Sequence, residues 1–277
     1  MNIGIRLHDT APGTLEQRLG FARAQGFSCA HLALSKVLPD FSMPDAPRLM
    51  DADLAARVRA AFEREDMGCA VLGCYLCLTA RDADEVRRTR EIYRAHLRFA
   101  REIGAGVVGT ETPPAPSLGM TGADTQSEEA FALFIECVKP LVRCAEEEGT
   151  ILAIEPVCEH IVSTPERAQR MLETLRSDSV RIILDAVNLL RSDMTDRADA
   201  VIDDAIARLG DRVSVLHMKD FTDAPGEPRP HSSACGTGRM RYGSLLALAR
   251  RCDLPMTLED TTPGNAEAAR KYLEGIQ

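Results

Sequence analysis

Four residues that can bind a metal ion stand at the ends of four consecutive apolar runs. They are Glu155 after ILAI, Asp185 after IIL, His217 after SVL and Glu259 after MTL. An ionised carboxylate in such a place is costly to remove from water unless it is paired or bound to a cation. Three carboxylates and one imidazole form a donor set for a divalent cation, with Mn²⁺ or Mg²⁺ favoured by the oxygen atoms and Zn²⁺, Co²⁺ or Fe²⁺ admitted by the histidine. A helix cap or an ion pair would explain any one of these residues, but four in a row favour a metal site.

The elements that must position these residues alternate between strand and helix. Apolar runs predict strands at 2–7, 28–34, 68–75, 106–111, 150–155, 180–185, 213–217 and 255–259. Helical spacing predicts helices at about 14–26, 51–66, 84–103 and 127–148, from Thr164 onward, and near 197–208, 242–251 and 264–275. Eight strand–helix units predict an α/β fold, a (β/α)8 TIM barrel, with an open doubly wound sheet as the alternative. In a barrel the four strand ends would lie along one arc of the same mouth.

Length and composition fit a single barrel domain over residues 1–277. The formal charge of −9 argues against non-specific binding to nucleic acid or to an anionic membrane, because both would repel the chain. No apolar run approaches the ~18–20 residues that span a bilayer. The start of the chain reads as a strand and not as a signal peptide, and the nine scattered cysteines read as buried thiols. We therefore expect a cytoplasmic protein.

Two short motifs are expected to be structural. Residues 104–109, GAGVVG, match G-x-G-x-x-G, but they follow a predicted helix and enter a strand, the reverse of the dinucleotide-binding order. Tight helix-to-strand packing explains them better. Cys74 and Cys77 form C-x-x-C without a second cysteine pair at matching spacing, which argues against a zinc or redox site.

Several segments resemble the xylose-isomerase-like barrel superfamily of sugar isomerases and epimerases. They are LAIEP (152–156), ILDAVN (183–188), LHMKD (216–220), CGTGRMRYGSLL (235–246) and LED (258–260). The resemblance runs through nearly the whole chain. It implies that Glu155, Asp185, His217 and Glu259 bind one metal ion, and it implies a homodimer or homotetramer. The family often has Asp-x-x-His after strand six, whereas this chain has Asn188, a poor metal ligand that cannot act as a base at neutral pH.

The donor set suits proton transfer next to a carbonyl group. A cation can hold the carbonyl and the neighbouring hydroxyl oxygen and stabilise the enediolate charge, while carboxyl groups on two faces remove and return a proton. In the related epimerases the two metal-binding glutamates take these roles. The resemblance therefore implies that Glu155 and Glu259 are catalytic in a metal-dependent isomerase or epimerase acting on a sugar, sugar phosphate or polyol.

Further polar residues are candidates for contact with a carbohydrate substrate. His8 ends strand one, Glu111 ends strand four, and Lys219 follows His217 by two residues, on the same side if the strand continues. Asn188 can hydrogen-bond a hydroxyl group, and Arg239 could meet an acidic substrate. Each also has a purely structural reading, as a buried polar residue, an ion-pair partner or a solvated surface residue.

Three other functions remain open at this point. A lyase or dehydratase acting on a keto-sugar, an inositol derivative or a glycoside would use the same site. An abasic-site endonuclease of the endonuclease IV type shares the barrel, but Asn188 and the net negative charge argue against it. A non-catalytic binding barrel would not need an intact set of metal ligands.

Overall fold

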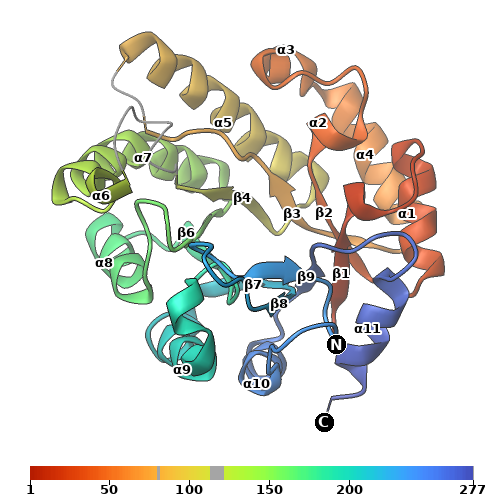
Figure 1. Cartoon of the computed structure of the whole chain (residues 1–277). Helices are drawn as coiled ribbons and strands as arrows, with labels where there is room; N and C mark the ends of the chain where they lie inside the picture. The colour runs from red at the N-terminus through yellow and green to blue at the C-terminus, as the bar shows by residue number, and fades with distance from the viewer. Residues whose placement is uncertain (80–81, 113–121, 277) are drawn as a thin grey trace.

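The strands close into a barrel in the computed structural model, which describes residues 1–79, 82–112 and 122–276. The eight barrel strands follow the order β1-β10-β7-β6-β5-β4-β3-β2, and every neighbouring pair is parallel (Figure 1). Their bounds are β1 Ile3–Arg6, β2 Cys29–Leu32, β3 Gly68–Gly73, β4 Val107–Glu111, β5 Leu152–Glu155, β6 Val180–Asp185, β7 Val213–Met218 and β10 Met256–Leu258. The predicted (β/α)8 barrel is therefore confirmed, and the open sheet is wrong.

In the described part of the chain, eight helices cover the outside of the barrel, one after each barrel strand (Figure 1). They are α1 Leu15–Ala24, α4 Ala52–Arg64, α5 Ala83–Ile103, α7 Glu128–Glu148, α8 Pro165–Leu175, α9 Ala198–Leu209, α10 Gly243–Cys252 and α11 Ala266–Glu274. Five of them begin with a side chain that accepts a backbone N–H of the first turn, from Thr14, Asp51, Asp82, Ser127 and Thr164. These caps satisfy donors that a helix start leaves free, so the sequence fixes where these helices begin.

Short elements fill the connections between strands and helices. They are α2 Leu34–Val37, α3 Ala46–Leu49 and α6 Gly122–Thr125, together with 3₁₀ turns at Leu7–Asp9, Met43–Asp45, Ser192–Arg197 and Gly210–Arg212. The predicted second strand, 28–34, is shorter than expected, because the chain turns into α2 at Leu34. The connection between β2 and α4 thus contains two short α-helices and a 3₁₀ turn.

The hydrophobic core has two parts, inside and outside the barrel wall. Small and β-branched side chains fill the interior, as expected where strands curve around a narrow axis: Cys29, Ala70, Val71, Val107, Ala153, Ile183 and Val215. Gly109 belongs to the same crowded interior, since a Cβ there would lie 2.6 Å from Val71 and 2.8 Å from Ile183. The larger cluster packs the strands against the surrounding helices. The interior is therefore solid below the mouth, and chemistry is confined to the strand ends.

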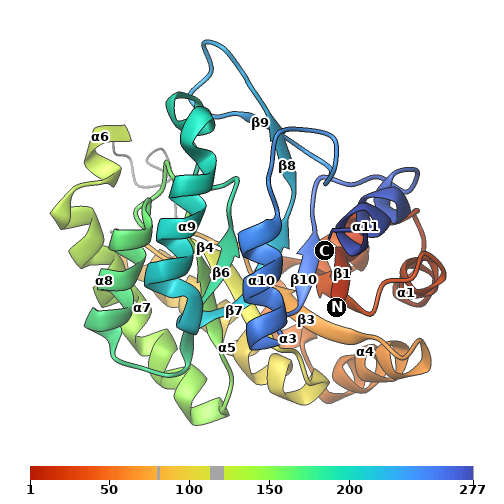
Figure 2. The ribbon, with the colours of Figure 1, turned by 90° about the horizontal axis from the view of Figure 1, so that it is seen from below.

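A two-stranded ribbon projects beyond the barrel between β7 and α10 (Figure 2). It consists of β8 Asp220–Thr222 and β9 His231–Ser233, paired antiparallel. The sequence predicted no strand or helix between 217 and 242, because the ribbon strands, DFT and HSS, form no apolar run. The Asp220 carboxylate accepts backbone N–H groups of Phe221, Gly236 and Met240 at 2.8, 3.0 and 2.7 Å. The ribbon and the turn after it are thereby tied to the end of β7.

The GAGVVG segment and the Cys74–Cys77 pair were both expected to be structural. Gly104 ends α5 in a left-handed conformation (φ 69°), and a Cβ on Gly106 would lie 2.8 Å from the Ala70 carbonyl oxygen. The motif therefore serves the passage from helix to strand. All nine cysteines are free thiols, and seven of them are buried. No helix in the described part of the chain is both long and apolar enough to span a membrane.

Candidate active site

The barrel brings the four predicted metal-binding residues to one mouth. Glu155 and Asp185 are the last residues of β5 and β6, His217 is the penultimate residue of β7, and Glu259 directly follows β10. Asp185 and His217 are partners in the β6–β7 register, which places their ends at the same level. All four are buried, with exposed fractions of 1, 0, 1 and 6%. Three carboxyl groups buried together require compensating positive charge.

His217 lies at the centre of the set. Its Nδ1 is 3.1 Å from Glu155 Oε2 and 3.2 Å from Glu259 Oε1. Neither ring nitrogen has an aligned hydrogen-bond partner among the described residues. Burial disfavours the charged ring, but Glu259 and Glu155 outweigh it and raise the pKa of His217 to about 9. The imidazole is thus held by its contacts with two carboxylates.

Asp185 divides its two oxygen atoms between the backbone and the site. Oδ1 accepts the N–H groups of Val187 and Asn188 at 2.9 and 3.0 Å, which orders the turn after β6. Oδ2 faces Lys219 Nζ at 2.9 Å. Burial raises the pKa of Asp185 to about 6, although the Lys219 ammonium acts in the opposite direction. One oxygen therefore fixes the local backbone, and the other is presented to the centre.

Two cationic side chains compensate the carboxylates. Lys219 Nζ also lies 3.4 Å from Glu259 Oε2, and Arg6 Nη1 lies 3.5 Å from the same oxygen. Burial disfavours the Glu259 carboxylate, yet His217, Lys219 and Arg6 together hold its pKa well below the usual range. The Lys219 ammonium thus compensates the charge of Asp185 and Glu259, the same carboxylates that a divalent cation would contact.

The donor chemistry fits a divalent cation. Ligand atoms of Glu155, Asp185 and His217 lie within 4.8 Å of one another, and Glu259 lies within that distance of His217 in a second set. Asp185 Oδ2 and both nitrogens of His217 are buried without an aligned hydrogen-bond partner in the described chain, although Oδ2 lies in ion-pair contact with Lys219 and Nδ1 with Glu155 and Glu259. Buried oxygen and nitrogen atoms that lack aligned hydrogen bonds are available to bind a cation. Three oxygen donors and one nitrogen donor suit Mn²⁺ or Mg²⁺ and also admit Zn²⁺, Co²⁺ or Fe²⁺.

Asn188 and Lys219, two of the residues predicted to contact a substrate, lie in this centre. Asn188 Nδ2 donates to Glu155 Oε1 at 2.5 Å, and its Oδ1 accepts from Lys219 Nζ at 3.1 Å. A third bond comes from Arg229 Nη2 at 2.6 Å. The Asn188 amide therefore links Glu155 to two cations and orients the Glu155 carboxylate.

The other three predicted substrate contacts divide into two groups. His8 and Glu111 line the cavity at the mouth. Burial, reinforced by Glu155 and Glu259, raises the pKa of Glu111 to about 8. Arg239 instead pairs with Asp196 and Asp223 on an exposed surface, so its contacts do not include the central set.

Arg229 and His31 are among the site residues that sequence reasoning missed. Arg229 reaches Asn188 from the loop between β8 and β9, and no local pattern could have indicated that. His31 lies in β2, is 2% exposed and lines the cavity. The available signal was a lone histidine within the apolar run SCAHLAL, beside Arg6 in the β1–β2 register. Burial, followed by the positive His217, lowers the pKa of His31 well below its ordinary value.

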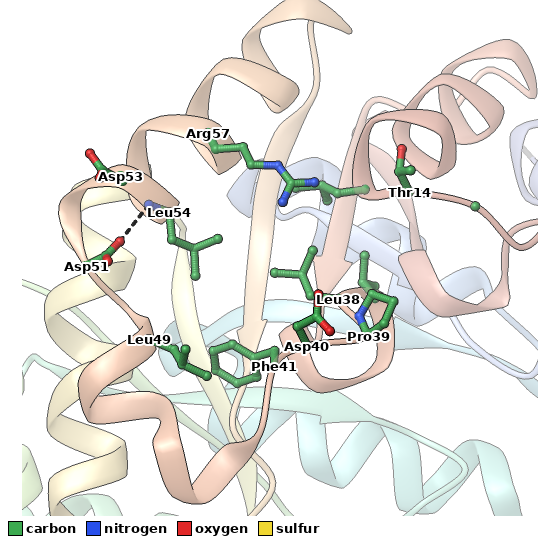
Figure 3. Close-up of a pocket in the computed structure, with 13 residues that line it drawn as sticks. Thr14, Leu38, Pro39, Asp40, Phe41, Leu49, Asp51, Asp53, Leu54 and Arg57 are labelled. Carbon is green, nitrogen blue, oxygen red and sulfur yellow. Dashed lines mark hydrogen bonds between the residues drawn. The ribbon is translucent and has the colours of Figure 1, made fainter.

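The cavity beside the candidate metal-binding residues is smaller than a second cavity elsewhere, so the site is identified by its residues and not by cavity volume. The cavity at the mouth has a volume of about 290 Å³ and is lined by Arg6, His8, His31, Ala33, Lys36, Tyr75, Glu111, Glu155 and Glu259. A larger cavity of about 520 Å³ lies between α1, α4 and the segment after α2. Leu38, Phe41, Leu49 and Leu54 gather around it (Figure 3). Its arginine, Arg57, is already paired with Glu16, and the described residues that line it include no histidine or cysteine.

Solved structures with the same fold cover essentially the whole chain. The IolI protein with a bound zinc atom has a TM-score of 0.69 and 16% identity, over 99% of this chain and 96% of that one. The 3-keto-D-glucoside 4-epimerase YcjR from E. coli has a TM-score of 0.75 and 14% identity over 100% of both chains. The probable 3-DHS dehydratase AsbF from Bacillus anthracis has a TM-score of 0.76 and 13% identity, again over 100% of both.

Sequence comparison adds the family. No curated protein matches the chain by sequence. The family described as the xylose isomerase-like TIM barrel matches residues 19–277, nearly the whole length. With the closed barrel and its structural neighbours, this match shows that the chain belongs to the xylose isomerase-like TIM barrel family.

Proposed function

We propose that this protein is a divalent-metal-dependent isomerase or epimerase that acts on a sugar or a sugar-like polyol derivative. The proposed reaction moves a proton on the carbon next to a carbonyl group. Structural neighbours include an epimerase of a keto-glucoside and a D-psicose 3-epimerase, which supports a small carbohydrate as substrate. The zinc-bound neighbour and the donor set support a divalent metal.

The proposal rests on the placement of two buried glutamates. Glu155 and Glu259 come from β5 and β10, which are three positions apart around the eight-stranded barrel. They therefore approach the centre from different sides, with His217 between them at 3.1 and 3.2 Å. Two carboxyl groups on different faces of one centre are what removal and return of a proton require.

The surrounding side chains would hold each glutamate in its role. Asn188 occupies Oε1 of Glu155, which leaves Oε2 for proton transfer. Lys219 and Arg6 hold Oε2 of Glu259, which leaves Oε1 toward the centre. A divalent cation bound by Glu155, Asp185, His217 and Glu259 would polarise the carbonyl and stabilise the developing enediolate charge.

Solvent isotope exchange tests this reaction. The purified protein with Mn²⁺ is incubated in D₂O with ketoses, inositol ketones and their phosphates, and deuterium next to the carbonyl is measured by NMR. We expect wild-type exchange with at least one compound. Glu155→Gln and Glu259→Gln should each lower its rate by about 10²–10⁴-fold, the usual contribution of a positioned acid or base. Exchange that survives both changes would remove these residues from proton transfer, and the exposed Glu63→Gln serves as the matched control.

A lyase or dehydratase is the second candidate, supported by the similarity to the probable 3-DHS dehydratase. The same enolising centre would then expel a leaving group from the carbon beyond the enediolate. The isotope experiment distinguishes the two reactions. An epimerase or isomerase returns a labelled sugar of unchanged composition, whereas a dehydratase gives an unsaturated product that has lost water.

A further inference from the structure

His31 is a buried residue at the mouth whose two polar atoms have no partner. It is 2% exposed, and neither Nδ1 nor Nε2 has a hydrogen-bond partner among the described residues. Leaving a buried donor and acceptor unpaired costs more than a typical hydrogen bond gains. A purely structural histidine would be expected to find a partner for at least one nitrogen.

The fold makes specific room for this ring. A Cβ on Gly73 would lie 2.7 Å from His31 Nε2, so a larger residue at this position of β3 would displace the ring. Tyr75 stacks on His31 with ring centroids 5.7 Å apart, and His217 stacks on it at 5.3 Å. Both contacts restrain the ring, which lines the cavity of about 290 Å³.

The stacking argues against a role for His31 as a ligand of the same cation as His217. Ligand atoms of His31, His217 and Glu259 do lie within 4.8 Å of one another. However, the two imidazoles are inclined by only 16°. Nitrogen lone pairs lie in the ring planes, so the lone pairs of two stacked, nearly parallel rings run side by side and do not converge on one ion. A ligand that enters the cavity is the better partner for the free nitrogens.

We propose that His31 is a substrate-binding residue that hydrogen-bonds a hydroxyl group of a polyhydroxylated substrate on the Glu259 side of the centre. The inference rests on the proposed function and adds which residue binds a hydroxyl group of the substrate. A neutral imidazole offers one donor and one acceptor, which match the two hydrogen-bonding capacities of a hydroxyl group. Because a ligand atom of His31 lies within 4.8 Å of one of Glu259, His31 would discriminate the configuration of the carbon on that side.

Paired variants test the role of His31. His31→Leu removes both nitrogens at similar volume, His31→Gln keeps a donor and an acceptor, and His96→Leu makes the same change at another buried histidine, on α5. The probes are D-fructose, 2-keto-myo-inositol and unreactive xylitol, added to the Mn²⁺-loaded protein. For the probes that bind, we expect His31→Leu to raise KM and the xylitol Kd on the order of tenfold. His31→Gln should recover part of this loss, and His96→Leu should leave both constants unchanged.

Metal binding and ring spectroscopy give readouts that do not depend on turnover. Mn²⁺ affinity should be unchanged in His31→Leu, and ¹⁵N signals of the His31 ring should shift when xylitol binds the wild type. Loss of Mn²⁺ affinity in His31→Leu would make His31 a metal ligand and overturn the proposal. Unchanged KM and Kd in a folded His31→Leu protein would overturn it as well. A wild type that binds and exchanges none of the probes would instead overturn the carbohydrate function, and this inference with it.

Discussion

At the scale of single residues, the centre depends on a balance of buried charge. The carboxylates of Glu155, Asp185 and Glu259 contact His217, Lys219 and Arg6. The Asn188 amide donates to Glu155 and accepts from Lys219. A buried pair of this kind adds little net stability, but removal of one partner leaves the other charge uncompensated. Each charged residue can therefore be tested through its effect on metal affinity and on stability.

Asp185→Asn is expected to weaken metal binding and to leave the fold intact. The amide oxygen can still accept from the N–H groups of Val187 and Asn188, but the charge facing the centre is lost. Loss of a residue that only supports a ligand typically costs roughly 10–100-fold in metal affinity, so loss of a direct donor should cost at least as much. Titration calorimetry with Mn²⁺ measures the change, with the exposed Asp178→Asn as control. Full metal occupancy in Asp185→Asn would refute the ligand assignment.

Lys219→Met is expected to destabilise the protein in chelator and to increase its stabilisation by metal. Without the ammonium, Asp185 and Glu259 lose a partner at 2.9 and 3.4 Å. Breaking a buried pair in this way typically costs about 3–5 kcal/mol. Thermal unfolding with EDTA and with Mn²⁺ measures both effects. Lys271→Met, which breaks an exposed ion pair with Glu267, should change little. Equal Mn²⁺ stabilisation of Lys219→Met and wild type would show that the ammonium and the cation do not share a site.

At the scale of elements, the ribbon β8–β9 was the least predictable part of the site. The barrel strands could be predicted because apolar runs of three to six residues alternate with helices. The ribbon strands, DFT and HSS, form no such apolar run, and Asp220 holds the ribbon in place. Arg229 reaches Asn188 only through this ribbon, so its contribution depends on tertiary structure that no local pattern contains.

Gly238→Ala should disrupt the turn that follows the ribbon. A Cβ at this position would lie 2.1 Å from the Phe221 carbonyl oxygen and 2.5 Å from Asp220 Oδ1. Since overpacking typically costs about 1–3 kcal/mol, we expect that loss of stability and faster proteolysis between residues 222 and 240. Urea unfolding and limited proteolysis measure these effects. Gly243→Ala, at the start of α10 with open space around it, is the matched control and should be neutral or stabilising. Identical proteolysis of the two variants would contradict the crowding argument.

At the scale of the whole molecule, the closed parallel barrel brings residues that are distant in the sequence into one site. The approach of Glu155, Asp185, His217 and Glu259 could be predicted because each follows a readable strand and parallel strands in a barrel all end at the same mouth. A role for His31 in the site could not be predicted from the sequence, because one polar residue in an apolar strand is equally compatible with a structural role. Its importance comes from the unpaired nitrogens and from the glycine opposite it, which only the packed structure shows.

Stability of the whole barrel should fall in mild acid, in part through His96 on α5. This ring is fully buried, its Nδ1 donates to the Ile92 carbonyl at 2.8 Å, and burial lowers its pKa from 6.5 to about 4. The unfolded chain therefore binds a proton between these two values while the folded chain does not, so stability decreases as the pH falls through that window.

The predicted loss from His96 is about 2 kcal/mol between pH 7 and pH 5. The leucine of His96→Leu cannot take up a proton in either the folded or the unfolded state. Between pH 7 and pH 5, the free energy of unfolding of this variant should therefore decrease by about 2 kcal/mol less than that of the wild type. Urea unfolding of both proteins at the two pH values, with EDTA present to remove metal effects, measures the difference. A gap between wild type and variant that is equal at pH 7 and pH 5 would show that the buried His96 ring takes up its proton without unfolding.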